Sequence, residues 1–468
     1  MNTIVQDMSH DFAIAQESME KEYILGGASF RDIFGLASSI SSWSRNEDKR
    51  TRHLCLATSN KTLIMAAILS SLGGGPSLVI PASLSDNVIA DTCKITGANA
   101  VLSDQPIALP KWIRSVPLYE KMTDVPAWRL AIGADKPFLW LYTGGSTGAP
   151  KLWSKTPDNI IGEALYLKKI FNITETDILL SAVLPLHIYG LLFSVLLPFV
   201  SRARVIDDIP YFPQEIIRTA ARTKCTAFIG SPMHYRALSA SSSRMKHLRL
   251  AFSSGGFLEK SHSLHFAHAN GIGVTEVYGS TETGGIATRC QSAKQSSWKP
   301  FSCVRWMIDS ERLSVSSPFL SPNLHTNKKG FFTTGDRASD SGNGTFTLHG
   351  RTDGIVKIGG KRVDLTAIEQ KIKSIPLIMD AWVLSLPSVS GRENDIAVLV
   401  VTRRTLPYIR RAFAEVLEPT HMPRLIANVP SIPVTLAGKR DHHAALSVLL
   451  QLRKNKKSGS DMQITKQS

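Results

Sequence analysis

Residues 141–151 read Leu-Tyr-Thr-Gly-Gly-Ser-Thr-Gly-Ala-Pro-Lys and follow the apolar run Pro137–Leu141. This order predicts a buried strand that opens into a glycine-rich loop. Glycines let backbone N–H groups approach an anion closely, and the hydroxyls of Thr143, Ser146 and Thr147 add donors. With Lys151 supplying a positive charge, the loop is suited to phosphate, although a simple polar turn fits the same residues.

The loop is not a P-loop of the Walker type, because Ala-Pro separates Gly148 from the lysine. Around it, short β-rich runs alternate with helical patterns, which predicts parallel sheets covered by helices, an α/β fold. The expected strands are His53–Thr58, Ser77–Ile80, Ala98–Leu102, Ala203–Ile206, Ala227–Ile229 and Leu248–Phe252, and the first expected helices are Leu63–Leu72 and Asp86–Thr96.

Composition excludes several classes of protein. With 468 residues, 43% hydrophobic and 20% charged, the chain is neither disordered nor collagenous and is long enough for two to four structural units. The cysteines are odd in number, five, and far apart. A disulfide framework or zinc ribbon is therefore not expected, and a reducing, cytoplasmic location is. The N-terminus shows no signal-peptide pattern.

The segment Ile178–Val200 is long and apolar enough to raise the question of a membrane span. Pro185, His187, Gly190 and Pro198 interrupt it. A buried strand over about residues 178–184, a turn, and an apolar helix from near Tyr189 fit it better. We therefore expect no stable membrane insertion.

The net charge of +16 indicates an anionic partner, and composition does not choose among nucleotide, coenzyme, acidic protein, nucleic acid and membrane. Residues 351–468 carry 19 basic and 10 acidic side chains, so +9 of the charge lies there. A turn-rich segment, Ser339–Gly344, precedes a predicted boundary at residue 350. Residues 453–468 lack apolar periodicity and predict a basic, disordered tail.

Three further segments fit a nucleotide. Residues 277–285 read Val-Tyr-Gly-Ser-Thr-Glu-Thr-Gly-Gly: the tyrosine can stack on a base, a hydroxyl can meet phosphate, and the carboxylate can hold Mg²⁺. A capped polar loop is the alternative. Asp336 in Phe332–Asp336 and the Gly350-Arg-Thr-Asp353 run suit a ribose. Pro433–Asp441 presents Lys439 on a glycine turn.

In this order, the segments resemble the adenylate-forming superfamily of acyl- and aryl-CoA synthetases and nonribosomal adenylation domains, over about Arg52 to Leu446. The resemblance implies a large N-terminal AMP-binding domain of mainly parallel sheets, residues 1–350. A small, mobile α+β lid would follow, residues 351–452. Gly144 stands where a serine is common, the region before the loop is short, and Arg312–Gly330 is compact.

The resemblance also implies a role for each matching residue. For the nucleotide, the β- and γ-phosphates would be handled by Thr143, Gly144, Gly145, Ser146, Thr147, Gly148 and Lys151. Thr281 would contact the α-phosphate and Glu282 the Mg²⁺. Gly255, Gly256 and Tyr278 would frame the adenine, Gly279 would also belong to the nucleotide site, and Asp336 and Arg351 would hold the ribose. For catalysis, Lys439 would reach the carboxylate and α-phosphate, Asp353 would be the hinge, and Lys357, Gly359 and Gly360 would serve thioester formation. His187 would line the acid pocket, although a histidine satisfied within its loop fits as well.

The implied reaction is ATP-dependent activation of a carboxylic acid as an acyl-adenylate, with release of pyrophosphate and transfer to CoA or the phosphopantetheine of a carrier protein. The run His-Ile-Tyr-Gly-Leu-Leu, residues 187–192, is similar to short bacterial AMP-ligases of aryl polyene, xanthomonadin-type pathways. That similarity implies an aryl or 3-hydroxyacyl acid. The basic C-terminal region favours an acidic acyl carrier protein as acceptor.

Three alternatives remain at this stage. A stand-alone amino-acid adenylation domain shares the fold, and a noncatalytic nucleotide-binding regulator shares the motifs. A nucleic-acid-binding protein has only the net charge in its favour, because zinc spacing, an RNP-like pattern and basic heptads are missing from the sequence. We therefore expect no nucleic-acid partner.

Overall fold

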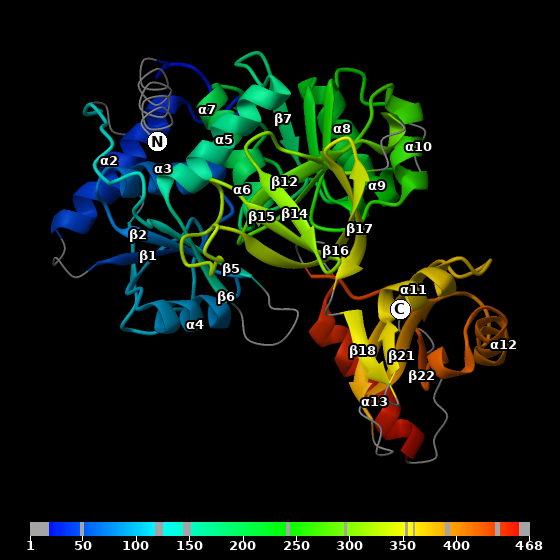
Figure 1. Ribbon diagram of the computed structural model, residues 1–468. Helices are drawn as coiled ribbons and strands as arrows, with labels where there is room; N and C mark the ends of the chain where they lie inside the picture. The colour runs from blue at the N-terminus through cyan, green and yellow to red at the C-terminus, as the bar shows by residue number, and fades with distance from the viewer. Residues whose placement is uncertain are drawn as a thin grey trace. The chain divides into compact units, whose positions relative to one another are not determined.

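The structure, a computed structural model, describes residues 18–46, 51–117, 125–143, 151–239, 244–293, 297–351, 354–358, 361–388, 394–435 and 440–457 (Figure 1). Two compact units divide the chain. The first comprises residues 1–306, 315–332 and 342–345, and the second comprises residues 307–314, 333–341 and 346–468. The domain limits derived from the sequence stay a prediction.

The first sheet of the first unit has the strand order β4-β3-β1-β2-β5-β6. Neighbouring strands are parallel except β6, which runs antiparallel to β5. The strands are β1 (His53–Leu56), β2 (Ser77–Ile80), β3 (Ala100–Leu102), β4 (Arg114–Ser115), β5 (Leu139–Thr143) and β6 (Lys151–Lys155). Its helices are α2 (Phe30–Asn46), α3 (Lys61–Leu72), α4 (Asp86–Thr96) and α5 (Pro157–Phe171). Figure 1 shows α3 and α4 on opposite faces of this sheet.

The second sheet has the order β13-β12-β11-β10-β9-β7-β8. The run from β11 to β8 is parallel, and β12 returns antiparallel beside β11. Its strands are β7 (Ile178–Ser181), β8 (Arg204–Val205), β9 (Ala227–Gly230), β10 (Leu250–Ser253), β11 (Thr275–Ser280), β12 (Gly284–Arg289) and β13 (Lys299–Pro300). The helical segments are α6 (Ile188–Leu191), the π-turn η1 (Leu192–Leu196), α7 (Leu197–Ser201), α8 (Pro213–Thr223), α9 (Pro232–Leu238), α10 (Lys260–Asn270) and η2 (Gln291–Ala293).

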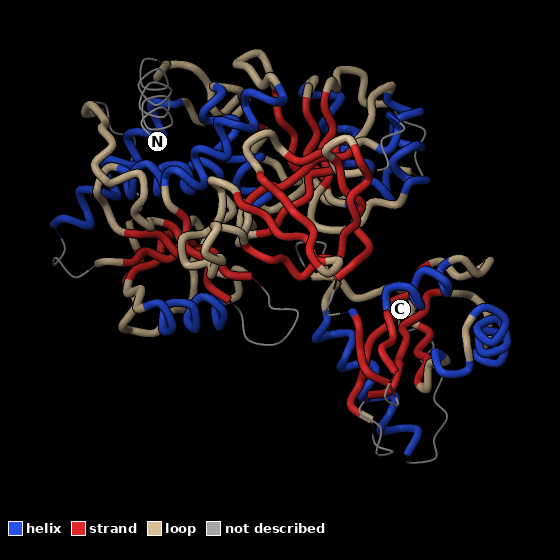
Figure 2. Tube along the Cα trace, viewed as in Figure 1, coloured by secondary structure: helices blue, strands red, loops and turns tan. Residues whose placement is uncertain are grey.

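A four-stranded sheet, order β14-β15-β16-β17, has its residues divided between the two units. The second unit adds a two-stranded sheet, β18-β19, and a three-stranded sheet, β20-β21-β22 (Figure 2). The strands are β14 (Arg305–Asp309), β15 (Arg312–Ser316), β16 (Phe332–Gly342), β17 (Thr345–Arg351), β18 (Ile355–Ile358), β19 (Lys361–Asp364), β20 (Asp380–Pro387), β21 (Asn394–Val401) and β22 (Leu425–Asn428). The helices are α11 (Leu365–Lys373), α12 (Leu406–Val416), η4 (Pro419–His421) and α13 (His442–Lys457).

The sequence signals explain where key elements begin. Asn60 caps α3 by accepting the N–H of Leu63, and every residue of that helix is buried, as expected for an apolar segment with no polar face. Helix α5 starts with a reciprocal capping box between Thr156 and Asn159, with Pro157 in its first turn. The predicted helices and strands of this unit, and the α/β class, are confirmed.

Residues 453–457, which begin the predicted tail, belong to helix α13. The Arg453 guanidinium donates to the Pro387 carbonyl at 2.8 Å and lies 3.6 Å from the Asp395 carboxylate. Residues 458–468 lie outside the described residues.

The apolar segment 178–200 folds as β7, α6, η1 and α7. Within the described ranges, no helix has both the length and the apolar character needed to cross a bilayer. All five cysteines fall inside those ranges and all are free thiols.

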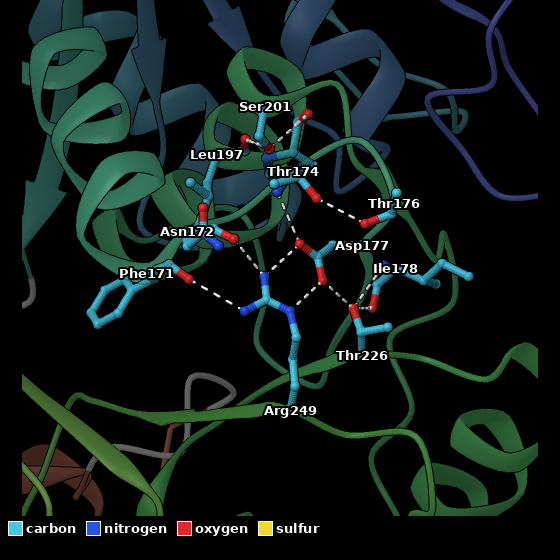
Figure 3. A network of polar contacts seen from close by, with 11 residues as sticks. Phe171, Asn172, Thr174, Thr176, Asp177, Ile178, Leu197, Ser201, Thr226 and Arg249 are labelled. Atoms are coloured by element: carbon cyan, nitrogen blue, oxygen red, sulfur yellow. Dashed lines mark hydrogen bonds and ion pairs between the residues drawn. The ribbon is translucent and has the colours of Figure 1, made fainter.

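A polar network fastens the amino end of β7 to its neighbours (Figure 3). The Arg249 guanidinium donates to the buried Asp177 carboxylate at 2.8 Å and to the Asn172 carbonyl at 2.7 Å. Thr226 donates to the same carboxylate at 2.6 Å. This network lies at the end of the strand opposite to the predicted site residues, so it belongs to the scaffold.

Candidate functional site

The predicted adenine-binding residues meet at the carboxyl ends of two adjacent parallel strands. β10 and β11 pair in register Ser253 to Glu276. Gly255 and Gly256 follow β10 and are exposed, while Tyr278 lies near the end of β11. The Ser254 hydroxyl donates to the Val277 carbonyl at 2.7 Å and ties the two strand ends together. Open α/β sheets bind ligands at such an edge.

The Tyr278 ring packs beside Trp298, which in turn contacts Arg289, and neither of these two residues was predicted from the sequence. The centroid of the Tyr278 ring lies 5.5 Å from that of the Trp298 ring. The Arg289 guanidinium stacks on the Trp298 ring, 4.5 Å from its centroid. Arg289 is held in turn by two hydrogen bonds of 2.9 Å to the buried Glu276 carboxylate. Nothing near Trp298 in the sequence points to its contact with Tyr278, which joins β11 to the residue that precedes β13.

The turn between β11 and β12 closes on itself. The N–H of Ser280 donates to the Thr283 hydroxyl at 3.1 Å, and the two hydroxyls lie 2.8 Å apart. A Cβ on Gly279 would lie 2.3 Å from the Gly284 carbonyl oxygen, so only glycine allows β12 to return this closely. The turn is therefore rigidly built rather than a loose polar loop.

Thr281 and Glu282 sit at the tip of this turn. Thr281 is buried and Glu282 is half-buried. The Glu282 carbonyl accepts the N–H of Ser321 at 2.8 Å, so its backbone is held. The residues that the sequence assigned to the α-phosphate and to Mg²⁺ are adjacent and presented together.

The predicted phosphate loop spans the ends of a hairpin. Thr143, the last residue of β5, pairs with Lys151, the exposed first residue of β6. Gly144, Gly145, Ser146, Thr147 and Gly148 lie outside the described residues, as does the Thr143 side chain. The structure therefore places the loop by its two ends.

One segment, residues 317–323, contacts both the hairpin and the turn. Asn323 accepts the N–H of Ser154 at 3.2 Å and donates to the Leu152 carbonyl at 3.0 Å, both on β6. Through Ser321, the same segment bonds the Glu282 carbonyl of the turn. The hairpin that carries the predicted phosphate loop and the turn of Thr281 and Glu282 thus share a support.

Two buried charged residues next to this support, Lys155 and Glu163, were missed. A signal was present for the second: Glu163 is a charge within the otherwise apolar run Ile160–Leu167 of α5.

His187 caps the amino end of α6 and is half-buried. The Tyr189 hydroxyl beside it donates to the Gly230 carbonyl at the end of β9, at 3.1 Å. The segment of His187 therefore lies against the same strand-end edge of the second sheet. Which of its two predicted roles His187 fills stays a prediction.

The second unit holds a separate group of predicted residues. Arg351 lies 3.7 Å from the Asp336 carboxylate, and a Cβ on Gly335 would lie 2.7 Å from the same guanidinium. The two residues assigned to the ribose are thus brought together. Lys357 pairs with Arg362 in the hairpin of β18 and β19, whereas Asp353, Gly359, Gly360 and Lys439 lie outside the described residues.

The side chains of Thr281 and Glu282 are suited to a Mg²⁺ ion that is also bound by the phosphates of the nucleotide. Across the described part of the chain, no three His, Cys, Asp or Glu side chains cluster to hold a metal by themselves. Mg²⁺ is commonly bound by one or two carboxylates plus substrate phosphates and water. A single half-buried carboxylate, Glu282, beside the buried hydroxyl residue Thr281 matches that mode.

Comparisons with known proteins agree with this geometry. Residues 60–317, more than half of the chain, match the family described as AMP-binding enzyme. A mitochondrial acyl-coenzyme A synthetase, ACSM2, from Rattus norvegicus is 24% identical over 54% of this chain and 51% of its own length. An anthranilate–CoA ligase from Pseudomonas aeruginosa is 26% identical over 64% of both.

The chain thus spans about half to two thirds of the length of these relatives. A solved structure, ATP-bound MatB from Rhodopseudomonas palustris, superposes with a TM-score of 0.78, covering 97% of this chain and all of that one at 18% identity. That likeness shows the fold. From the strand-end edge, the closed turn and the matched residues together, the chain belongs to the AMP-binding enzyme family.

Proposed function

We propose that this protein is an AMP-forming acid–thiol ligase that activates a carboxylic acid with ATP and passes the acyl group to a pantetheine thiol. The observation that carries the proposal is the shared support of residues 317–323. It fastens the β5–β6 hairpin and the turn of Thr281 and Glu282 to one another. Two phosphate-handling segments held together in this way suit a triphosphate bound in one orientation.

The first half-reaction joins the acid to the α-phosphorus. A carboxylate oxygen attacks that phosphorus in line, the bond to the bridging oxygen breaks, and pyrophosphate leaves. Thr281 would contact the α-phosphate, and Lys439 would offset the repulsion between the carboxylate and the phosphates. Glu282 would hold Mg²⁺, which neutralises charge on the phosphate oxygens.

For the nucleoside, we propose the roles that the family resemblance implies. Tyr278, Gly255 and Gly256 would frame the adenine, Gly279 would also belong to the nucleotide site, and Asp336 and Arg351 would bind the ribose. Thr143 to Gly148 and Lys151 would cover the β- and γ-phosphates. Residues 1–350 would form the AMP-binding domain, and Asp353 would be the hinge to the lid of residues 351–452.

In the second half-reaction, a thiolate attacks the acyl carbon and AMP leaves. Lys357, Gly359 and Gly360 would serve this step. We propose an aryl or 3-hydroxyacyl acid, of the kind used in aryl polyene pathways, and an acidic acyl carrier protein rather than CoA as acceptor. The cytoplasm, where such carrier proteins and ATP are found, is the proposed location.

The test is acid-dependent ATP–pyrophosphate exchange with Mg²⁺. The panel holds hydroxybenzoic, cinnamic, coumaric, medium-chain and 3-hydroxy fatty acids, together with amino acids. We expect exchange with an aryl or 3-hydroxyacyl acid, reduced roughly 10²- to 10³-fold in Lys439→Ala because a contact made in the transition state is lost.

Lys371→Ala is the matched control, since it removes an exposed lysine of α11 outside the proposed site. Exchange with amino acids alone would instead indicate an adenylation domain. If the protein binds Mg-ATP but none of the acids supports pyrophosphate exchange, it is a nucleotide-binding regulator, and the proposal fails.

A further inference from the structure

Lys155 and Glu163 are two of the buried charged side chains of the described residues, and they lie outside every motif of the sequence, next to residues 317–323. Lys155, the last residue of β6, is 0% exposed, and Glu163, in α5, is 2% exposed. Burying an ionised group is costly unless partners compensate for the lost water. The contacts of these two residues therefore show what their burial serves.

Glu163 contacts the strand that leaves the turn. Its Oε1 accepts the N–H of Gly285 at 2.7 Å. A Cβ on Gly284 would lie 2.6 Å from Oε2, and one on Gly285 would lie 3.0 Å from Oε1. The two glycines that end the Thr-Glu-Thr-Gly-Gly run are what allow the carboxylate to approach the backbone this closely. Oε2 has no hydrogen-bond partner within the described ranges.

Lys155 contacts the shared support on the other side. Its ammonium donates to the Phe319 carbonyl at 3.0 Å, two residues before Ser321, whose N–H bonds the Glu282 carbonyl. Burial lowers the pKa of Lys155, and the carboxylates of Glu163 and Glu282 oppose that change. Burial raises the pKa of Glu163, and Lys155 and the Gly285 N–H oppose it. Each charge therefore stabilises the other where water is excluded.

We propose that Lys155 and Glu163 are a positioning pair that fixes the Ser280–Thr283 turn relative to the β5–β6 hairpin, so that both segments address one triphosphate. Lys155 belongs to the hairpin and grips residue 319, while Glu163 follows it on the next helix and grips residue 285. Glu163 thus holds the strand that leaves the turn directly, and Lys155 holds the segment whose Ser321 bonds the Glu282 carbonyl of the turn. This inference rests on the proposed function, because it assigns the pair to the phosphate-handling segments named there.

The experiment compares the apparent KM for Mg-ATP and the kcat of pyrophosphate exchange with resistance to urea. In Glu163→Ala, we expect KM to rise and kcat to fall, together by about 10- to 100-fold, because a displacement near 1 Å of a catalytic group has effects of that size. The matched control is Asp177→Ala, which removes an equally buried carboxylate from the network of Figure 3, away from the turn. It should lower the urea midpoint while leaving KM within about twofold of wild type.

A conservative series keeps the test informative if Glu163→Ala folds poorly. Glu163→Gln retains an oxygen that can accept the Gly285 N–H but removes one of the two carboxylates, Glu163 and Glu282, that favour the charged form of Lys155. Adding Lys155→Met removes both charges while keeping that acceptor, and replacing both partners of a buried pair is often tolerated. We expect the double variant to recover only part of the KM and kcat that Lys155→Met alone loses, because the hydrogen bond to the Phe319 carbonyl is missing from both.

Wild-type KM and kcat in Glu163→Ala, with only the urea midpoint lowered, would overturn the positioning role. So would losses in Asp177→Ala equal to those in Glu163→Ala. If the wild type binds Mg-ATP and exchanges no pyrophosphate, the proposed function fails separately, and the Kd for Mg-ATP becomes the readout. An unchanged Kd in Glu163→Ala would then refute the pair's role, and a Kd raised at least about tenfold would support it.

Discussion

At the scale of single residues, the chain separates charges that build the scaffold from those near the candidate site. Asp177 and Arg249 belong to the scaffold, since their partners are backbone carbonyls and Thr226. Burial alone would raise the pKa of Asp177, but hydrogen bonds from Arg249, Thr226 and the Thr174 N–H lower it below its ordinary value. Folding therefore favours the ionised form of the Asp177 carboxyl group.

This shift predicts how stability depends on pH. The folded pKa of Asp177 lies below its unfolded value near 3.9, so its contribution is fully present above about pH 4 and is lost as pH falls through the folded pKa. Asp177→Asn should lower the free energy of unfolding at pH 7 by about 3 kcal/mol, the lower end of the range for breaking a buried pair, because Arg249 keeps partial access to water.

Urea unfolding from pH 3 to 7 measures both effects. The gap between wild type and Asp177→Asn should narrow below about pH 4. A gap that stays constant over the whole range would show that the charge of Asp177 does not carry the stabilisation.

At the scale of elements, secondary structure followed from local sequence while its irregular parts did not. The strand Ser77–Ile80 and the helix Asp86–Thr96 have the predicted bounds. Such elements are set by apolar periodicity and by capping residues, which are local. The π-turn η1 inside the segment 188–201 carried no such signal, because it arises from packing of a fully buried helix.

Gly190 is the point at which that segment is most constrained. A Cβ there would lie 2.0 Å from the Leu184 carbonyl oxygen, a backbone atom that has to move. Gly190→Ala should therefore lower the free energy of unfolding by about 2 kcal/mol or more. It should also raise the apparent KM for the acid, since the segment carries His187.

Thermal unfolding and exchange kinetics at varied acid concentration measure the two effects. Gly97→Ala is the control, because Gly97 ends α4 with a positive φ of 71° and a Cβ added there would have no atom within 4 Å. It should cost stability through backbone strain and leave the KM for the acid unchanged. A Gly190→Ala protein with wild-type stability would contradict the packing of this segment.

At the scale of the whole molecule, net charge predicts how the acceptor is reached. A chain of charge +16 attracts an acidic carrier protein at long range, and salt screens that attraction over about 10 Å at 0.1 M. Under limiting carrier protein, thioester formation should slow by about tenfold or more between roughly 50 and 500 mM NaCl.

Exchange of pyrophosphate with the same acid provides the internal reference for general salt effects. If the rate of thioester formation does not change with salt, and free CoA is a better acceptor than every carrier protein, the carrier protein is ruled out as the acceptor. The proposed acid activation would remain untouched by that result.

The amino-acid sequence by itself determined the α/β class, most element positions and the motifs of the candidate site. These depend on local patterns: an apolar run before Thr143, glycines at Gly255 and Gly256, or a Thr-Glu pair at residue 281. Only the tertiary structure decided which groups support them. Glu163 contacts Gly285 across 122 residues, Lys155 contacts Phe319 across 164, and Trp298, just before β13, contacts Tyr278 of β11. Those contacts depend on burial and close approach of distant segments, for which a single sequence carries no local signal.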